Sequence, residues 1–270
     1  VWKYDSQHPN VAIAGAVFQV KYLSGNTSGT GGTVIGTFRT SGNGSFTATG
    51  LKKGTYIIEE LSSDGSHVID TPPQTVYLSG EEQEVIQVYF GNSAKGALLV
   101  SKVGDDGEPL SGVEFLVTKS DGTLVGDANG KFVTGQDGTF LVDNIDPNTT
   151  LVVKETRTKS GYLLDDAAQT AVVKAGRTVR LQFINHKTGN LIIHKLSGAD
   201  KKTPLAGVQF KITYADGRVV DAEGGKLSSN GLYWTDSLGQ IILSNITGTV
   251  ICTEVSSIDG FAIDPNTRSQ

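Results

Sequence analysis

The chain has 270 residues, of which 37% are hydrophobic and 19% are charged, and its formal net charge is −5. This length suits two or three domains. The acidic balance and the lack of a basic stretch argue against nucleic acid as a partner. No apolar run approaches the roughly 20 residues that a membrane helix needs, so we expect no membrane contact by this segment.

Short runs rich in Val, Ile, Thr, Tyr and Phe lie between clusters of Gly, Asp and Asn, a pattern typical of an all-β protein. The sequence contains no Met and opens without a signal peptide, so we expect a processed fragment of a longer protein. Cys252 is the only cysteine, and no intrachain disulfide can form. This predicts either a cytosolic protein or an exported one that is stabilised by other means.

The strand that opens the chain carries a lysine, and it recurs twice. The three occurrences read VWKYD, LLVSKVGDD and LIIHKLSGAD (residues 1–5, 98–106 and 191–200). An apolar-x-Gly-apolar-x-Phe signal follows each of them as IAGAVF, LSGVEF and LAGVQF (residues 13–18, 110–115 and 205–210). The same signals therefore return in the same order along the chain.

Later in each copy comes a strand that ends in an acid. It reads TYIIEEL, TLVVKET and TVICTEV (residues 55–61, 150–156 and 249–255). The first two copies then close with EVIQVYFGN and TVRLQFIN (residues 84–92 and 178–185). The third copy shows no such closing strand: either it is truncated before one, which we favour, or another chain supplies the strand by β-augmentation.

Equivalent residues recur at a nearly constant period. The lysines are 99 and 93 residues apart, and the acids 95 and 99. This period is much longer than that of solenoid repeats, so each copy is expected to be a domain. We place the domains at residues 1–93, 94–187 and 188–270, joined by short connectors that favour a rod-like array. Each is predicted to be an immunoglobulin-like β-sandwich of about seven strands, the third lacking its last strand.

The alternation of side chains along a strand predicts which residues point inward. In the first acid strand Glu60 shares a face with Tyr56 and Ile58, whereas Glu59 lies on the opposite face and is expected to be solvated. The same phase places Glu155 and Glu254, as well as Cys252, among core residues of the later copies.

The closing strands and the lysine strands follow the same rule. Ile86, Val88 and Phe90 share a face with Asn92, and the equivalent residue of the second copy is Asn185. The lysines lie in phase with apolar residues of their strands: Lys3, Lys102 and Lys195. Each complete copy is therefore predicted to direct one Lys, one Glu and one Asn toward its core.

Two interpretations of this triplet remain. The residues can lie at the rim of the sandwich, where lysine reaches solvent and asparagine caps a turn. Alternatively, burial lowers the pKa of the lysine, which becomes a neutral nucleophile, and raises the pKa of the glutamate, which stays protonated. The glutamate then polarises the side-chain carbonyl of the asparagine and shuttles protons. Attack on the asparagine side chain with loss of ammonia then leaves a Lys–Asn isopeptide bond, formed once per domain.

The ordered set of motifs resembles the Cna-B-type domains of Gram-positive bacterial surface adhesins and pilins, which are prealbumin-like (transthyretin-like, SpaA-like) sandwiches. The set comprises the lysine strand, L-x-G-V-x-F, a D-G turn, the acid strand followed by G-Y or G-F, and a terminal F-x-N. The resemblance covers essentially the whole chain three times. The first copy departs from it at Ser66 and His67, where the others have a Gly–aromatic pair.

The resemblance implies that lysine and asparagine form the bond and that the strand glutamate catalyses it. These roles fall on Lys3, Asn92 and Glu60 in the first copy, and on Lys102, Asn185 and Glu155 in the second. In the third copy Lys195 and Glu254 match, but the partner asparagine is absent and is expected near about position 285.

Other candidate sites are weaker. The four histidines lack metal-ligand spacing, so we expect no metal and no cofactor: His8, His67, His186 and His194. The third copy carries an insertion at residues 222–236, whose LYW segment is either a strand packed on the sandwich or an exposed aromatic contact for a ligand. In the second interpretation Tyr233 and Trp234 would touch the ligand.

The sequence thus predicts a non-enzymatic stalk or adhesin segment of a secreted bacterial surface protein, attached to the cell wall through regions outside this chain. The expected contacts are neighbouring domains of the same chain and a host matrix protein or glycan. The alternative is a ligand-binding module for glycan, mucin or extracellular matrix that uses the sandwich as a scaffold. A third hypothesis is a set of accessory domains of a carbohydrate-active enzyme.

Overall fold

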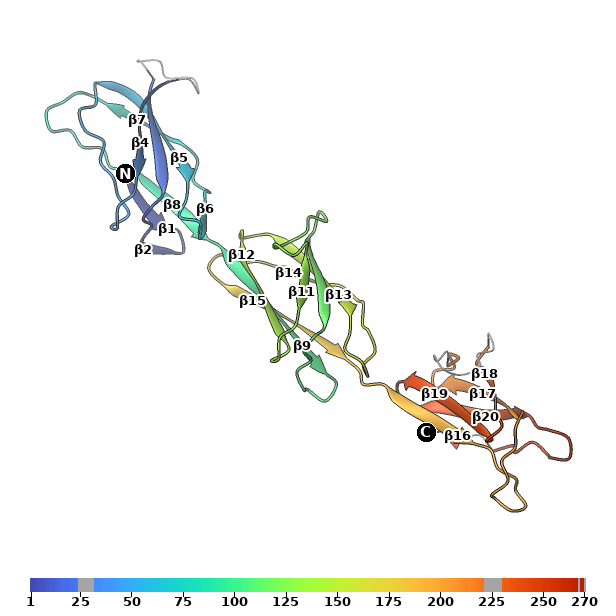
Figure 1. Ribbon diagram of the computed structural model, residues 1–270. Helices are drawn as coiled ribbons and strands as arrows, with labels where there is room; N and C mark the ends of the chain where they lie inside the picture. Colours follow the sequence, from blue (N-terminus) through green and yellow to red (C-terminus); the bar gives the residue numbers. More distant parts are fainter. Residues whose placement is uncertain (24–31, 221–229, 267, 270) are drawn as a thin grey trace.

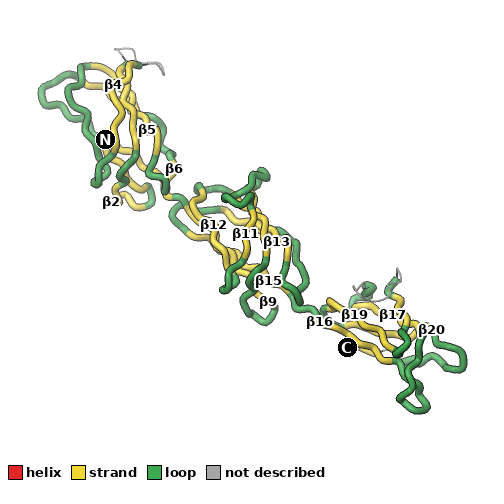
Figure 2. Tube along the Cα trace, in the orientation of Figure 1, coloured by secondary structure: helices red, strands yellow, loops and turns green. Residues whose placement is uncertain are grey.

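A computed structural model describes residues 1–23, 32–220, 230–266 and 268–269 of the chain. Among these residues every regular element is a β-strand. The strands gather into three units that follow one another in an extended array (Figure 1), and loops occupy the ends of each unit (Figure 2). The predicted all-β class and the three tandem sandwich domains are confirmed.

The first unit is a sandwich of two four-stranded sheets, ordered β2-β1-β8-β6 and β4-β3-β5-β7. In it β1 and β8 run parallel, while the other pairs are antiparallel. The strands are β1 Trp2–Asp5, β2 His8–Ala12, β3 Val17–Tyr22, β4 Thr33–Arg39, β5 Gly54–Ser62, β6 His67–Val68, β7 Gln74–Leu78 and β8 Tyr89–Ala94.

The second unit repeats one four-stranded sheet as β11-β10-β13-β14, whereas its other sheet has three strands, ordered β12-β9-β15. Its first and last strands, β9 and β15, run parallel over eight residue pairs. The strands are β9 Gly96–Gly104, β10 Glu114–Lys119, β11 Lys131–Val133, β12 Thr139–Ile145, β13 Thr150–Arg157, β14 Gln169–Val172 and β15 Thr178–Asn185.

The third unit has sheets ordered β16-β19 and β18-β17-β20-β21. Here β21 pairs with β20 as β14 pairs with β13, and no strand within the described ranges pairs with β16 as β15 pairs with β9. The strands are β16 Gly189–His194, β17 Gln209–Tyr214, β18 Leu232–Trp234, β19 Gln240–Ile246, β20 Val250–Ser256 and β21 Arg268–Ser269.

Each unit has its own hydrophobic core between the two sheets. In the second unit the ring of Phe115 on β10 packs against Phe140 and Phe183, with centroids 5.3 and 5.0 Å apart. The first unit repeats the last of these contacts with Phe18 and Phe90 at 5.0 Å. The phenylalanine of the x-Gly-apolar-x-Phe signal thus packs against the phenylalanine two residues before the closing asparagine.

One prediction about buried residues is wrong, and a second is met only in part. Ile86 was expected in the core but is 36% exposed, because β8 begins only at Tyr89 and residues 84–88 lie outside any strand. β8 begins later in its segment than β15 does because its parallel partner β1 begins at Trp2, which is aligned with Tyr89. Cys252 packs against the core of the third unit, as its strand phase predicts, but it is only half-buried; this burial raises the pKa of its thiol.

A buried threonine fixes the turn that follows each lysine strand. In the second unit the Thr134 hydroxyl donates to Leu110 O (2.6 Å) and accepts from Val113 N (3.0 Å). Leu110 N in turn donates to Lys102 O, so this bridge holds the chain against the lysine strand. The first and third units repeat the bridge with Thr40 and Thr235.

Candidate functional site

In the second unit the predicted triplet lies on three different strands. Lys102 is on β9, Asn185 ends β15, and Glu155 is on β13 of the opposite sheet. All three side chains are buried, with relative exposures of 0, 1 and 0%. The alternation of the strands brings them to the same inner face, as the sequence pattern predicts.

One carboxylate lies between the amine and the amide. The Lys102 Nζ atom is 3.6 Å from Glu155 Oε2, and Asn185 Nδ2 donates a hydrogen bond to Glu155 Oε1 at 2.6 Å. Asn185 Nδ2 also donates to the Thr158 hydroxyl at 2.7 Å. Asn185 Oδ1 is buried and accepts no hydrogen bond from the described part of the chain. The glutamate therefore contacts the amide nitrogen, and the expected contact with the carbonyl oxygen is not found among the described residues.

The first unit builds the same arrangement from different residues. Lys3 Nζ lies 2.9 Å from Glu60 Oε2, and Asn92 Nδ2 donates to Glu60 Oε1 at 2.8 Å. The Ser63 hydroxyl accepts a second hydrogen bond from Asn92 Nδ2 at 3.1 Å. Glu59 points the other way, where its carboxylate accepts a hydrogen bond from a surface lysine at 2.9 Å. The two adjacent glutamates are thus separated as the strand alternation predicts.

Burial changes the ionisation of both lysines and both glutamates. Removal from water lowers the pKa of Lys3 and Lys102, although the glutamate beside each of them opposes this shift. Removal from water also raises the pKa of Glu60 and Glu155, against the effect of the lysine and asparagine contacts. Both shifts favour the uncharged forms, an amine and a carboxylic acid.

The third unit contains only part of this arrangement. Lys195, which directly follows β16, has its Nζ atom 2.8 Å from Glu254 Oε2, and its side chain is 17% exposed. Glu254 accepts a further hydrogen bond from Asp264 N at 3.2 Å. Within the described ranges no asparagine side chain reaches this glutamate, whose Oε1 atom is buried without a hydrogen bond.

Comparison with protein families matches the SpaA prealbumin-like fold domain three times, at residues 1–94, 96–187 and 189–268. The chain belongs to this SpaA domain family. Comparison with curated proteins finds no significant match.

Three solved structures illustrate what the SpaA domains of this chain are similar to. The Bacillus anthracis TIE protein is 22% identical with a TM-score of 0.45, and the match covers 100% of this chain but 47% of that protein. BcpA, the major pilin subunit of Bacillus cereus, is 16% identical (TM-score 0.43), covering 99% and 93% of the two chains. The shaft pilin SpaA of Lactobacillus rhamnosus GG is 17% identical (TM-score 0.39), covering 66% and 89%.

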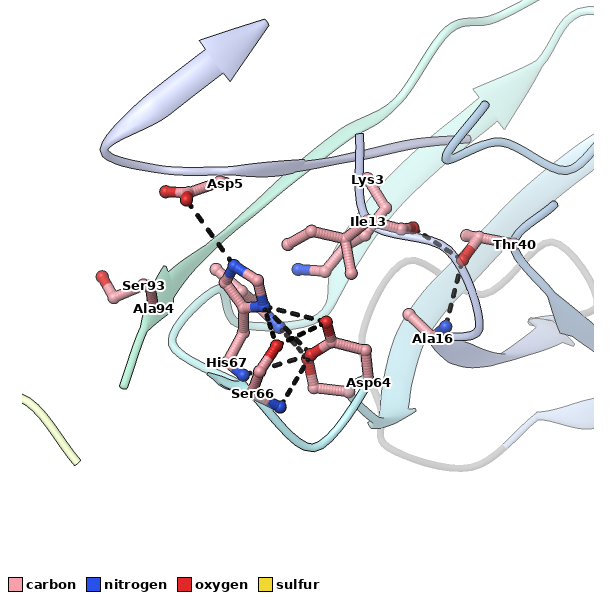
Figure 3. A network of polar contacts seen from close by, with 12 residues as sticks. Lys3, Asp5, Ile13, Ala16, Thr40, Asp64, Ser66, His67, Ser93 and Ala94 are labelled. Carbon is pink, nitrogen blue, oxygen red and sulfur yellow. Dashed lines mark hydrogen bonds and ion pairs between the residues drawn. The ribbon is translucent and has the colours of Figure 1, made fainter. Parts of the chain in front are cut away.

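The first SpaA domain surrounds its lysine with a polar cluster that the second lacks. The His67 ring lies between two carboxylates, with Nδ1 3.0 Å from Asp64 Oδ1 and Nε2 3.7 Å from Asp5 Oδ2 (Figure 3). In the second domain the equivalent positions hold Tyr162 and Gly104, and a Cβ atom at Gly104 would lie 3.1 Å from the tyrosine ring. Glycine thus makes room for the aromatic ring, whereas the first domain replaces this pair with Asp5 and His67.

The sequence reasoning missed a hydroxyl group beside each glutamate. Ser63 and Thr158 accept hydrogen bonds from the asparagine amides, and both lie three residues after the glutamate of their domain. The third SpaA domain has Ser257 at the same distance after Glu254. The sequence signal was the pattern Glu-x-x-Ser/Thr, which recurs in all three copies.

The aromatic pair of the third SpaA domain divides between core and surface. Tyr233 on β18 is only 1% exposed and its hydroxyl donates to Val220 O. Its burial contradicts a role as an exposed ligand contact and supports the packing interpretation. Trp234 is 41% exposed. Most of the insertion before β18 belongs to residues 221–229, which lie outside the described residues.

Proposed function

We propose that the chain is a structural stalk or adhesin segment of a Gram-positive bacterial cell-surface protein. In this proposal each complete SpaA domain forms an autocatalytic isopeptide bond, Lys3 to Asn92 in the first and Lys102 to Asn185 in the second. The observation that carries the proposal is a buried glutamate that contacts both a buried amine and a buried carboxamide, and it occurs in two domains.

The geometry supports a proton shuttle through the glutamate. The neutral Nζ atom of lysine attacks Cγ of asparagine, and the protonated carboxyl group gives its proton to Nδ2 through Oε1. The Cγ–Nδ2 bond breaks and ammonia leaves, while Oε2 takes one proton from the attacking nitrogen. The products are an amide and ammonia, and the carboxylic acid is restored. Folding supplies the proximity that makes this step unimolecular.

The bonds would form a continuous load-bearing path along the chain. β8 ends at Ala94 and β9 begins at Gly96, so the last strand of one domain leads directly into the first strand of the next. Tension would pass from Lys3 to Asn92, along the junction to Lys102, and across to Asn185. The remaining strands of each domain would then carry no load, which suits a stalk.

For the ligand-binding alternative, only one of the two predicted aromatic contacts is exposed, Trp234 on β18. This alternative predicts that Trp234→Ala weakens binding to glycan, mucin or a matrix protein. The stalk proposal predicts no such loss, because the candidate bonds lie in the first two domains. Attachment to the cell wall belongs to the same proposal and would use regions outside this chain.

Intact mass spectrometry of the purified chain tests the proposal. Each bond removes one ammonia, so the measured mass should be lower than the sequence mass by two molecules of ammonia. Lys102→Ala should restore one of them and leave the other. A wild-type mass equal to the sequence mass would contradict the proposed function.

A further inference from the structure

We propose that Ser63 and Thr158 are positioning residues of the isopeptide reaction, whose hydroxyl groups hold the amide nitrogen that leaves as ammonia. This inference rests on the proposed function and adds a residue to each site. The hydroxyl would act on the asparagine, whereas the glutamate exchanges protons with the lysine and the amide.

The contacts in the second domain show how the amide is held. Thr158 directly follows β13, which ends at Arg157, and so lies at the end of the strand that carries Glu155. Asn185 Nδ2 donates to Thr158 Oγ1 at 2.7 Å and to Glu155 Oε1 at 2.6 Å. A primary amide has two N–H bonds, so these two acceptors use both of them. The plane of the amide is therefore set by two contacts from one strand end.

The first domain repeats this geometry with a serine. Asn92 Nδ2 donates to Ser63 Oγ at 3.1 Å and to Glu60 Oε1 at 2.8 Å. Serine and threonine share the hydroxyl on Cβ and differ by a methyl group, and the hydroxyl oxygen makes the contact in both domains. The recurrence therefore points to the hydroxyl itself and not to the packing of the side chain.

The third domain carries the hydroxyl without the amide. Ser257 Oγ is buried and makes no hydrogen bond within the described ranges, where no asparagine side chain contacts Glu254. A buried hydroxyl without a partner destabilises a fold. Its presence at this position is explained if the position serves an incoming carboxamide.

The hydroxyl has two effects on the reaction. Attack on a planar amide requires the nucleophile to approach out of the plane, so fixing that plane increases the fraction of reactive geometries. While the amide nitrogen takes the proton of the carboxyl group and leaves as ammonia, the hydroxyl oxygen can continue to accept a hydrogen bond from one of its N–H groups. Both effects act on the leaving nitrogen.

The test compares Thr158→Val with Thr158→Ser in the full chain. Valine keeps the shape of threonine without its hydroxyl, and serine keeps the hydroxyl. Each chain is made by cell-free synthesis, synthesis is stopped, and intact mass is followed with time at several pH values. The bond of the first domain forms in the same molecule and serves as the internal reference.

We expect the second domain of T158V to release its ammonia about tenfold to 100-fold more slowly than that of wild type, the range that misplacement of a reacting group produces. T158S should restore the rate to within about threefold of wild type. The Thr158 hydroxyl also contacts Glu155 and lowers its pKa, so T158V should shift the pH range upward, and the rates are therefore compared at the pH optimum of each variant.

Three results would overturn the positioning role. They are a wild-type rate in T158V, failure of T158S to restore the rate, and a changed pH range with an unchanged maximal rate. If T158V does not fold, Ser63→Ala decides the question in the first domain by the same measurement. Absence of any ammonia loss from wild type would contradict the proposed function itself, which distinguishes that failure from this one.

Discussion

Lys102 and Asn185 lie on neighbouring parallel strands but two residues out of register, because Lys102 is aligned with Phe183 and Asn185 with Gly104. The first domain has the same offset, with Lys3 aligned with Phe90 and Asp5 with Asn92. An offset of two keeps both side chains on the inner face of the sheet. The two side chains therefore lie diagonally across the strand pair, and a glutamate from the opposite sheet contacts both of them.

The two adjacent glutamates of β5 offer a matched pair of substitutions. Glu60→Gln removes the proton shuttle of the first domain, so we expect its mass deficit, relative to its own sequence mass, to be smaller than that of wild type by one ammonia. Glu59→Gln alters a surface ion pair with Lys21 and should leave the mass deficit unchanged. Intact mass spectrometry measures both. Retention of the full deficit in E60Q would argue against the role of the carboxyl group.

Loss of the second bond should lower stability through the unfolded state. Lys102 and Asn185 are 83 residues apart, and a cross-link that closes such a loop stabilises by about 4.5 kcal/mol in the chain-entropy relation used for disulfides. Asn185→Ala should therefore reduce the unfolding free energy of the second domain by roughly this amount. Urea denaturation measures it, and Asn190→Ala, an exposed position on β16, is the control. Equal stabilities of N185A and N190A would contradict the covalent link.

The buried glutamate should make the unlinked domain sensitive to pH. Burial raises the folded-state pKa of Glu155 above its ordinary value of 4.5, so the folded state holds the proton more tightly than the unfolded state. Its contribution to stability is therefore fully present below the unfolded pKa and is lost as pH rises through the raised pKa.

This pH dependence is measured by comparing two variants that cannot form the second bond. We expect the unfolding free energy of Asn185→Ala to fall, relative to that of the N185A/E155Q double variant, as pH rises from about 4 to 7. Carboxylates other than Glu155 contribute equally to both proteins and cancel. If the unfolding free energy of N185A does not fall relative to that of the double variant as pH rises, the buried glutamate is not held as an acid.

The threonine bridge should contribute to stability independently of the bond. Thr134→Val leaves Leu110 O and Val113 N without the hydroxyl that joins them, and buried groups without partners cost about 1–3 kcal/mol. Denaturation in the N185A background measures the loss. Thr170→Val on the exposed face of β14 is the control, since it keeps a β-branched side chain in a strand. We expect T134S to retain most of the stability, and a T134V chain as stable as T170V would refute the bridge.

Alternation and period were sufficient to predict much of this protein. Because side chains alternate along a strand, the spacing of Glu60 from Tyr56 and Ile58 placed it inward and Glu59 outward. Because the motifs recur at a domain-sized period, three sandwiches followed, and a lysine, a glutamate and an asparagine could be assigned to one inner face. Both the alternation along a strand and the repeat of the motifs can be recognised from the order of the residues alone.

Only the tertiary structure decided how the strands meet. The parallel pairing of β9 with β15, its register, and the position of Glu155 across the sandwich depend on contacts between segments far apart in the chain. The same contacts expose Ile86, against expectation, choose the packed interpretation for Tyr233, and bring the Thr158 hydroxyl to the asparagine amide. A strand pattern specifies which face a side chain occupies, but only packing between sheets specifies which atoms it touches.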